Sequence, residues 1–600
     1  MKFLYSALAA FLLTAGILPA ASLDNHPHWR SEKLPDLYYE VLSSSLEQAI
    51  ELQAPDGRYR TRLPSPADPD ETGWRVTWMQ YIYAPALLYV TENGANSFHG
   101  SKAALECAIA AGDYLASIVE ADGSVLPRVN GKPTNPLDAH RTVYCWTEAF
   151  ALLRPHLDNE RTTRWAAALK RAGELIAESE VFSKIHRPKY TSPFLGFSPN
   201  HLGLRATTVY RLGMVLDIPE WVERTEPALI RFVQHIRPGG YWEEHNGPTM
   251  SYDYLNVSVA GLLWHYSSHP DAMRAMRINT DFHTHWTTPD GIDIHTVDQR
   301  NRNHFSPLAA YGLFAFSHFP DGRRYARFRL LTTLGDGNKP LQAKGLEALA
   351  RIAQSAHYHV DGEEATIPQQ LPSYHHALDR PAVVRKSGGW VYSMSALVSP
   401  ERPKSQFYMD RIVPVSLWNI ATGAIIGGGN SKGQPQLATF AVHCSDGQWS
   451  YLPLDALIRG SFDADTMCVA HEGFSLRFTF NIENDSHATV RAQAEFTYDR
   501  PDTAYLHIPL VMHPGGTLDT GEGGSFTLDE QPLEITGGKR ISHNGWSALL
   551  PAAATLTWPF YTYHPYGSVR VPKNIHNAQA VLAVPLTNDG EWVEVKFRVN

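Results

Sequence analysis

The chain has 600 residues, which is too many for one hydrophobic core and predicts two or more domains. With 43% hydrophobic and 19% charged residues, its composition is that of an ordinary globular protein. Its formal net charge of -9 argues against a general nucleic-acid binder, which would present a basic surface.

Residues 1–22 have the pattern of a secretory signal peptide. Lys2 precedes an apolar run from Phe3 to Leu18, and small residues follow at Ala20–Ser22. A mature chain that starts near Leu23 would be secreted or periplasmic. No later stretch reaches the ~18 consecutive apolar residues of a spanning helix, so we expect no membrane span.

The helical part of the pattern runs from Pro35 to about Gln354, with apolar residues at 3–4 spacing. Gly-, Pro- and Asn-rich links separate the segments, as in a series of αα-hairpins. Such hairpins most naturally close into an α/α toroid. The predicted helices are Tyr38–Leu52, Thr77–Thr91, Ser101–Ile118, Val143–Leu152, Arg161–Ala177, Leu202–Leu216, Glu220–His235, Tyr254–Tyr266, Pro270–Thr280, Pro307–Phe319, Gly322–Leu334 and Leu341–Ala356.

After about Pro368 the pattern changes to short β-rich segments separated by Gly, Asp and Asn turns, which predicts an antiparallel β-sandwich. Domains are therefore expected at 23–370 (toroid) and 371–600 (sandwich), with the boundary between Glu364 and Arg380. The predicted strands are Ala382–Val398, Ser405–Val413, Gln436–His443, Phe474–Ile482, Ala488–Tyr498 and Glu591–Val599.

Four cysteines fall as one pair in each predicted domain: Cys107 with Cys145, and Cys444 with Cys468. Export would allow disulfides to persist. Bridged pairs and buried free thiols both fit the sequence, and none of the four has metal-site spacing.

One polar and aromatic stretch, Gly239–Tyr254, stands out from the helical pattern. Ser198–Gly203 (SPNHLG) precedes it and Asp298–His304 (DQRNRNH) follows it. This concentration of Asn, His, Tyr and Arg suits a site that handles an acidic sugar without paired carboxylates.

Several other features have ordinary structural explanations. His283, His285 and His295 give an HxH pattern, but no carboxylate accompanies it at helical spacing, so we expect no metal site. Trp74 and Trp78 lie at helix spacing and fit either core packing or a sugar-stacking platform.

The stretch Gly240–His245, with Tyr254 nine positions after His245, is similar to a motif of the hyaluronate, chondroitin AC and xanthan lyases. Asn200 and the Arg300–Arg302 segment keep the order Asn, His, Tyr, Arg of those enzymes. The toroid followed by a sandwich agrees as well, so the resemblance covers most of the mature chain.

The motif also departs from that family. Gly239-Gly240 replaces the usual glycine-aspartate opening, and no second well-spaced arginine follows Arg302. Toroid lyases of the heparinase and alginate-oligosaccharide type are equally similar, and in that comparison Asn200, His201 and either Tyr254 or Tyr252 match the motif.

The resemblance implies a polysaccharide lyase that acts by β-elimination on a uronic-acid glycan. Asn200, with His245 or Arg302, would neutralise the uronate carboxylate, and Tyr254 would remove the C5 proton and protonate the leaving oxygen. Cationic neighbours would favour the phenolate form of Tyr254. His245 is the other candidate base, and Tyr252 competes for the tyrosine role. The expected substrate-binding residues are His201, Tyr252, Arg300, His304, Trp242, Asn246, Trp74 and Trp78.

This mechanism requires no cofactor, and its partner is an acidic polysaccharide or oligosaccharide rather than nucleic acid. Two rival functions are a glycoside hydrolase that uses two carboxylates on the same toroid, and a non-catalytic glycan-binding protein. On the lyase hypothesis, Tyr254→Phe is expected to abolish elimination and leave the fold intact.

Overall fold

The computed structural model describes most of the chain beyond its first 32 residues, so the predicted signal peptide lies outside the described part. Within the described part, no helix has the length and apolar character needed to cross a membrane. The described ranges are 33–60, 76–125, 128–129, 132–133, 139–178, 198–244, 247–300, 311–334, 345–398, 406–460, 464–497, 503–521, 523–565 and 574–600.

The N-terminal half is helical, and most of its helices match the predicted segments. The helix predicted at Pro307–Phe319 is an exception, because among its described residues 311–319 only Leu313–Phe316 are α-helical. A 3-10 segment, η2 (Val76–Ile82), leads into α3, so the segment predicted at Thr77–Thr91 is only partly α-helical. The α-helices are α2 (Leu34–Leu52), α3 (Tyr83–Val90), α4 (Lys102–Ile118), α5 (Ala139–Leu153), α6 (Asn159–Ala177), α8 (Pro199–Leu216), α9 (Pro219–Gln234), α10 (Met250–Ser267), α11 (Pro270–His285), α12 (Leu313–Phe316), α13 (Pro320–Leu334) and α14 (Leu346–His357).

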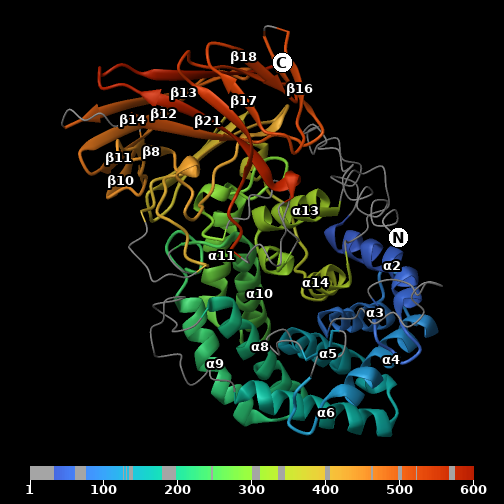
Figure 1. Ribbon diagram of the computed structural model, residues 1–600. Helices are drawn as coiled ribbons and strands as arrows, with labels where there is room; N and C mark the ends of the chain where they lie inside the picture. Colours follow the sequence, from blue (N-terminus) through green and yellow to red (C-terminus); the bar gives the residue numbers. More distant parts are fainter. Residues whose placement is uncertain are drawn as a thin grey trace.

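These helices form an inner and an outer ring (Figure 1). In the inner ring α3 contacts α5, α5 contacts α8, α8 contacts α10, α10 contacts α12, and α12 contacts α14. The ring closes because α14 packs on α3. Helices α2, α4, α6, α9, α11 and α13 pack around it. The predicted α/α toroid is confirmed.

The C-terminal half consists of two antiparallel sheets. The first has the strand order β10-β11-β12-β13-β22-β19-β18-β15-β16, and the second has β17-β20-β21-β14-β7-β6-β5-β4-β3, with β8 and β9 attached beside β14. A two-stranded hairpin, β1 (Arg128–Val129) with β2 (Lys132–Pro133), belongs to the helical half. The other strands are β3 (Ser373–Ala377), β4 (Ala382–Ser387), β5 (Trp390–Ser395), β6 (Val415–Asn419), β7 (Gly423–Ile426), β8 (Phe440–His443), β9 (Trp449–Ser450), β10 (Asp455–Gly460), β11 (Asp465–His471), β12 (Phe474–Asn484), β13 (His487–Phe496), β14 (Thr503–Leu510), β15 (Thr517–Thr520), β16 (Ser525–Thr527), β17 (Leu533–Thr536), β18 (Arg540–His543), β19 (Trp546–Leu549), β20 (Thr555–Tyr561), β21 (Ala578–Leu586) and β22 (Val593–Val599).

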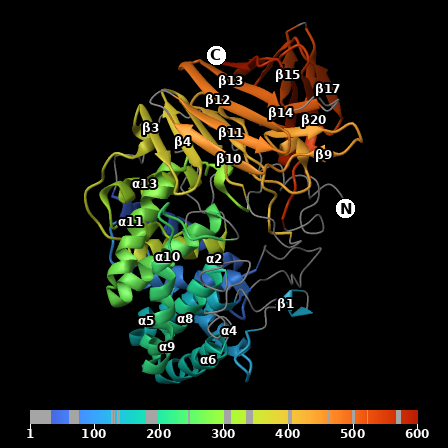
Figure 2. The ribbon, with the colours of Figure 1, turned by 90° about the vertical axis from the view of Figure 1, so that its left-hand side faces the viewer.

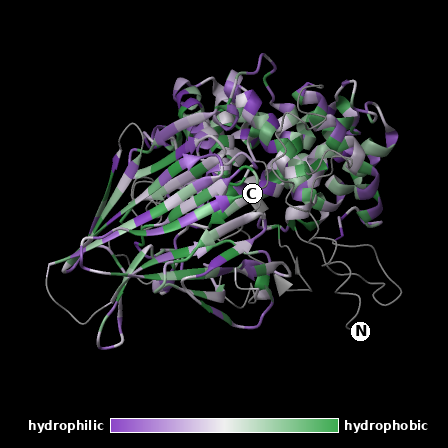
Figure 3. Cartoon of the chain, turned by 90° about the horizontal axis from the view of Figure 1, so that it is seen from above, coloured by the Kyte–Doolittle hydropathy of each residue, from purple (hydrophilic) through white to green (hydrophobic). Residues whose placement is uncertain are grey.

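Alternating side chains make the core between the two sheets, and Figure 3 shows apolar and polar bands alternating along the strands. In β22, Val595, Phe597 and Val599 are buried while Lys596 and Arg598 are exposed, as a strand with one buried face requires. The predicted sandwich is therefore confirmed.

One predicted strand, Ser405–Val413, is wrong within the described residues 406–413, which form a loop. Its apolar residues Met409, Ile412 and Val413 are buried, so the apolar pattern arose from a packed loop rather than from a sheet. The change from helix to strand falls between His357, where α14 ends, and Ser373, where β3 begins.

The sandwich stands over one end of the helical ring (Figure 2). A separate apolar cluster joins the two halves: Tyr241, Phe282 and Trp286 of the toroid pack with Val391 and Trp418 of the sandwich. This contact fixes the loops at that end of the ring, where the Gly239–Tyr254 stretch lies.

The four cysteines are free thiols. Cys107 and Cys145 are buried, and Cys107 Sγ lies 3.3 Å from the Tyr59 hydroxyl. Of the two alternatives that the sequence left open, the structure supports free thiols.

Candidate active site

The Gly239–Tyr254 stretch begins with a tight loop after α9. Gly240 has φ +87, and a Cβ there would lie 2.3 Å from the carbonyl oxygen of Ile278, so only glycine fits. The loop is tied to the sandwich because Tyr241 Oη donates to Asp379 at 3.1 Å and Arg380 pairs with Glu243. These contacts set the position of Glu244, the next residue along.

Glu244 and Gly247 bond to each other through their backbones. Gln299 N donates to the carbonyl of Pro248 at 2.9 Å, which places the segment ending at Arg300 beside Gly247 and Pro248. His245 and Asn246 lie outside the described residues, as do Arg302, His304 and Trp74. Their predicted roles stay predictions.

Arg300 is the centre of the described site. Its guanidinium donates to Glu244 Oε1 at 3.1 Å and to the Tyr252 hydroxyl at 3.4 Å. Its Cζ lies 4.2 Å from the ring centre of Phe407, a residue of the sandwich loop, and 5.3 Å from that of Tyr252. Aromatic rings on a guanidinium hold it in place and keep water away from it.

Glu244 connects this arginine to helix α8. Burial raises the pKa of Glu244 to about 7, with Arg300 and a hydrogen bond to Ser198 opposing the shift and Asp298 adding to it. Ser198 is the residue before α8, and Asn200 and His201 lie in that helix's first turn. The starts of α8 and α10 and the segment ending at Arg300 therefore meet at one place.

Asn200 is 3% exposed, and its amide oxygen has no hydrogen-bond partner among the described residues. Leaving a buried polar group unsatisfied costs about 1–3 kcal/mol, which a bound ligand or water would recover. Ser198 occupies the N-cap position, so capping does not explain Asn200.

His201 faces a positively charged environment. Burial lowers its pKa to about 4, and Arg205, Arg141 and Arg300 lower it further by repulsion. His201 is therefore a neutral imidazole near pH 7 and cannot neutralise a carboxylate as a cation. Arg205 and Arg141, which the sequence pattern did not single out, are part of this environment.

Tyr254 lies in the core of the toroid. It is 0% exposed, its hydroxyl donates to Asp293 Oδ1 at 2.8 Å and contacts the Tyr325 hydroxyl at 2.7 Å, and its ring stacks on His283. Burial raises its pKa well above the usual value. Its role as the proton-transfer residue stays a prediction.

Tyr252, the competing residue, is half-buried in the first turn of α10 and contacts Arg300. Helix α10 begins at Met250, four residues before the predicted start, so both tyrosines lie within it. Tyr252 contacts Arg300, whereas Tyr254 is buried in the toroid core.

The two described tryptophans predicted to bind sugar differ. Trp242 is 1% exposed, stacks on Phe232 and donates its indole N–H to a backbone carbonyl at 2.8 Å, so it is a core residue. Its predicted role is corrected for that reason. Trp78 is half-buried on the toroid core and keeps an accessible face.

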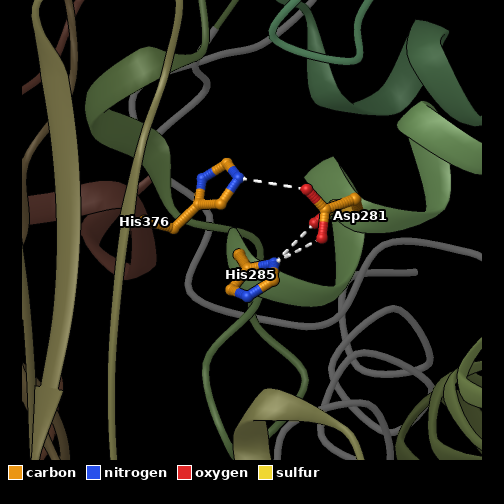
Figure 4. A group of neighbouring side chains, drawn as sticks. All are labelled: Asp281, His285 and His376. Atoms are coloured by element: carbon orange, nitrogen blue, oxygen red, sulfur yellow. Dashed lines mark hydrogen bonds and ion pairs between the residues drawn. The ribbon is translucent and has the colours of Figure 1, made fainter.

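The two histidines of the HxH pattern, His283 and His285, have different surroundings in the structure. His283 stacks on Tyr254, whereas His285 joins Asp281 and His376, whose possible ligand atoms all lie within 4.8 Å (Figure 4). His285 Nδ1 donates to the Asp281 carbonyl at 2.8 Å. Trp286 Nε1 donates to His376 Nδ1 at 3.1 Å, so the proton of that ring is on Nε2, which faces Asp281 at 3.4 Å.

Both ring nitrogens that face Asp281 therefore carry protons, whereas a metal would need their lone pairs. The hydrogen bonds from His285 and then from His376 lower the pKa of Asp281. In this arrangement the cluster is a hydrogen-bonded link between α11 and β3, and so between toroid and sandwich.

Comparison with solved structures finds several chains of similar architecture. A chondroitin AC lyase from Streptomyces coelicolor A3 is 12% identical, with 95% of this chain and 80% of that chain covered and a TM-score of 0.48. A heparan sulfate lyase from Pedobacter heparinus is 11% identical, with 93% and 82% covered and a TM-score of 0.46. A heparinase III is 9% identical, with 98% and 92% covered and a TM-score of 0.45.

Neither the protein-family models nor the curated proteins contain a match to this sequence. Identities this low transfer no residue role to the chain.

Proposed function

We propose that the protein is a secreted or periplasmic polysaccharide lyase that cleaves a uronic-acid glycan by β-elimination. The observation that supports this most directly is the Arg300 guanidinium, which donates to both the Tyr252 hydroxyl and the Glu244 carboxylate. The site thus combines a group that can exchange a proton with groups that can hold a carboxylate.

The chemical difficulty is the C5 proton, because the neighbouring carboxylate resists further negative charge. Donors aimed at that carboxylate stabilise the charge that develops during proton removal. Arg300 fits this role, and the Asn200 amide adds a second polar group. His245 and Arg302, from the sequence motif, would complete it.

Tyr252 then acts as the base. A guanidinium that donates to its hydroxyl oxygen stabilises negative charge on that oxygen. After taking the C5 proton, the same hydroxyl donates a proton to the leaving O4 when both atoms lie on one face of the sugar. The glycosidic C4–O4 bond breaks, a C4–C5 double bond forms, and no water or cofactor is consumed.

The rival hydrolase has one observation in its favour. A carboxyl with pKa near 7, such as Glu244, is the type of group that glycosidases use as general acid, and Asp298 lies close enough to influence it. However, the Glu244 carboxyl is already paired with Arg300. A proton on Glu244 is therefore poorly placed for donation to a leaving oxygen.

The product distinguishes the functions. Incubation with uronic polysaccharides should give absorbance in the ultraviolet band of a 4,5-unsaturated uronate, and this signal should accompany new chain ends. New reducing ends without that absorbance would identify a hydrolase. Binding without either signal would identify a glycan-binding protein.

A further inference from the structure

The Thr296–Arg300 segment, which ends in the arginine of the candidate site, belongs to the toroid but is held by the sandwich. Ser393 Oγ of β5 and Thr296 Oγ1 share a hydrogen bond of 2.8 Å. Asn430 Nδ2, from the loop after β7, donates to the Asp298 carbonyl at 3.4 Å. The sandwich therefore fixes the backbone that presents the arginine.

The backbone of the sandwich also passes directly against this segment. A Cβ added at Gly428 would lie 2.6 Å from Thr296 Cγ2 and 2.4 Å from the carbonyl oxygen of Val415. A larger residue at position 428 would therefore push the two halves apart. Thr296 and Ser393 are both 0% exposed, so this junction is part of the packed interior.

One ring of the sandwich reaches the arginine side chain itself. The ring centre of Phe407 lies 4.2 Å from Arg300 Cζ, closer than the ring centre of Tyr252 at 5.3 Å. Phe407 is half-buried, and it lies in the loop 406–413. The strongest aromatic contact of Arg300 among these two therefore comes from the other half of the molecule.

The loop that carries Phe407 is tied to the rest of the sandwich. Hydrogen bonds fix its backbone on both sides of that residue: Tyr563 Oη donates to the Gln406 carbonyl at 2.9 Å, Lys432 Nζ to the Tyr408 carbonyl at 2.8 Å, and Asp410 N to the Ser431 carbonyl at 2.8 Å. A loop held in this way presents its aromatic ring in a preset position.

The face contact matters because a guanidinium is planar. Its N–H groups all lie in one plane, so a ring on its face decides the plane in which they can donate. Arg300 donates to Glu244 Oε1 and to the Tyr252 hydroxyl. Without the ring, the positive charge would remain, but the guanidinium could turn about its bonds and its donors would lose their direction.

We propose that Phe407 is a positioning residue of the elimination reaction, through which the sandwich orients the Arg300 guanidinium toward Tyr252 and the uronate carboxylate. The reaction then needs both halves of the molecule, although its candidate acid and base come from the toroid. This inference rests on the proposed function for its reaction, whereas the orientation of Arg300 can be measured without a substrate.

The first test is Phe407→Leu, which keeps an apolar side chain and removes the flat ring face. Its kcat for formation of unsaturated uronate should fall about tenfold, as expected for loss of a desolvated cation–π contact. KM should change little, because Arg300 keeps its charge. Phe407→Tyr keeps the ring and should retain the wild-type kcat. A wild-type kcat in Phe407→Leu would overturn the proposal.

Phe319 offers a matched control outside the candidate site. It is also half-buried, its ring centre lies 4.5 Å from Arg277 Cζ, and Arg277 pairs with Asp321 at 2.6 Å. Phe319→Leu should lower the unfolding midpoint about as much as Phe407→Leu and leave kcat unchanged. Equal losses of kcat in the two variants would assign the effect to packing and contradict a positioning role.

A double variant separates an action through Arg300 from a direct action on the substrate. Phe407→Leu added to Arg300→Lys should lower kcat no further than Arg300→Lys alone, because both substitutions remove the same oriented guanidinium. If the two effects multiplied, Phe407 would act independently of Arg300, and the proposal would be wrong.

The last test needs no substrate. In the NMR spectrum of the arginine Nε–H groups of the isotope-labelled full-length protein, the Arg300 signal is the one that Arg300→Lys removes. Phe407→Leu should move this signal to the position of solvent-exposed arginines, whereas Phe407→Tyr and Phe319→Leu should leave it in place. An unmoved signal in Phe407→Leu would overturn the proposal. If the wild type formed no unsaturated uronate, the proposed function would fail, and this signal would still decide whether Phe407 orients Arg300.

Discussion

Two sites on helix α10 are built from the same three kinds of side chain but have opposite characters. Tyr252 lies with Arg300 and Glu244, and Tyr254 lies with Arg329 and Asp293. In each, an arginine pairs with a carboxylate and lies beside a tyrosine ring. The distance from the arginine Cζ to the ring centre is 5.3 Å for Tyr252 and 5.2 Å for Tyr254.

The difference lies in how deeply the tyrosines are buried. Arg329 is 0% exposed, donates to the Gly291 carbonyl and to Asp293 Oδ2, and Asp293 Oδ1 accepts from Tyr254, which is also 0% exposed. That network lies in the toroid core. The Arg300 network is the more exposed one, since Tyr252 is half-buried.

This comparison shows that residue types alone do not identify a site of chemistry. A fully buried network stabilises the fold, because its charges are paired inside the core. A network that includes a half-buried tyrosine can be reached by a ligand. Substitutions at matched positions in the two networks should therefore act on different properties.

The largest effect is expected for Tyr252→Phe. Loss of a positioned acid and base lowers kcat about 10²–10⁴-fold. The variant should fold and unfold like the wild type, because the half-buried hydroxyl contributes little to the core. The rate of unsaturated uronate formation measures the activity, and the unfolding midpoint measures the stability. Full activity of Tyr252→Phe would remove this residue from the mechanism.

Tyr254→Phe should lower the stability and leave the activity nearly unchanged, the opposite of Tyr252→Phe. Without the hydroxyl, Asp293 loses a donor in a buried site, and Tyr325 loses a partner, which should cost about 3 kcal/mol of unfolding free energy. Activity per folded molecule should stay close to wild type. Denaturant unfolding and the same assay test this, and a stable but inactive Tyr254→Phe would confirm the role predicted from the sequence.

Glu244 provides a test through pH. Its folded pKa is raised to about 7 from an unfolded value near 4.5, so the folded state holds the proton more tightly. Stability is therefore greatest below the unfolded pKa and falls as pH rises from about 4.5 to 7, by about 2–3 kcal/mol. Glu244→Gln should lack this fall in urea unfolding measured across that range. An unchanged pH profile in the variant would mean that Glu244 is not the titrating group.

The overall architecture could be predicted because it depends on repeated patterns. Apolar residues at 3–4 spacing marked nearly every helix of the ring, and alternation marked strands such as β22. The loop at 406–413 was taken for a strand because a packed loop also buries apolar residues, and periodicity cannot separate the two.

The site could be located from sequence but not resolved to single side chains. The motif left Tyr254 and Tyr252 as alternatives, and both lie near the start of α10, where helix boundaries are hardest to predict. Phe407, Arg141 and Arg205 come from distant segments, and only folding brings them near Arg300 or His201. The polar and aromatic stretch Gly239–Tyr254 was the sequence signal that pointed to this region.

The smallest effect is expected when each arginine is replaced by lysine. In Arg300→Lys the ammonium keeps the charge but cannot stack flat on Phe407 or donate to Tyr252 and Glu244 together, so kcat/KM should fall about tenfold. Stability should change little. In Arg329→Lys the same exchange removes donors from a fully buried network, so the unfolding free energy should fall while kcat/KM per folded molecule stays close to the wild-type value. If both variants lost activity equally and kept their stability, the two networks would not divide catalysis from stability, and the assignment of Tyr252 to the reaction would lose its main support.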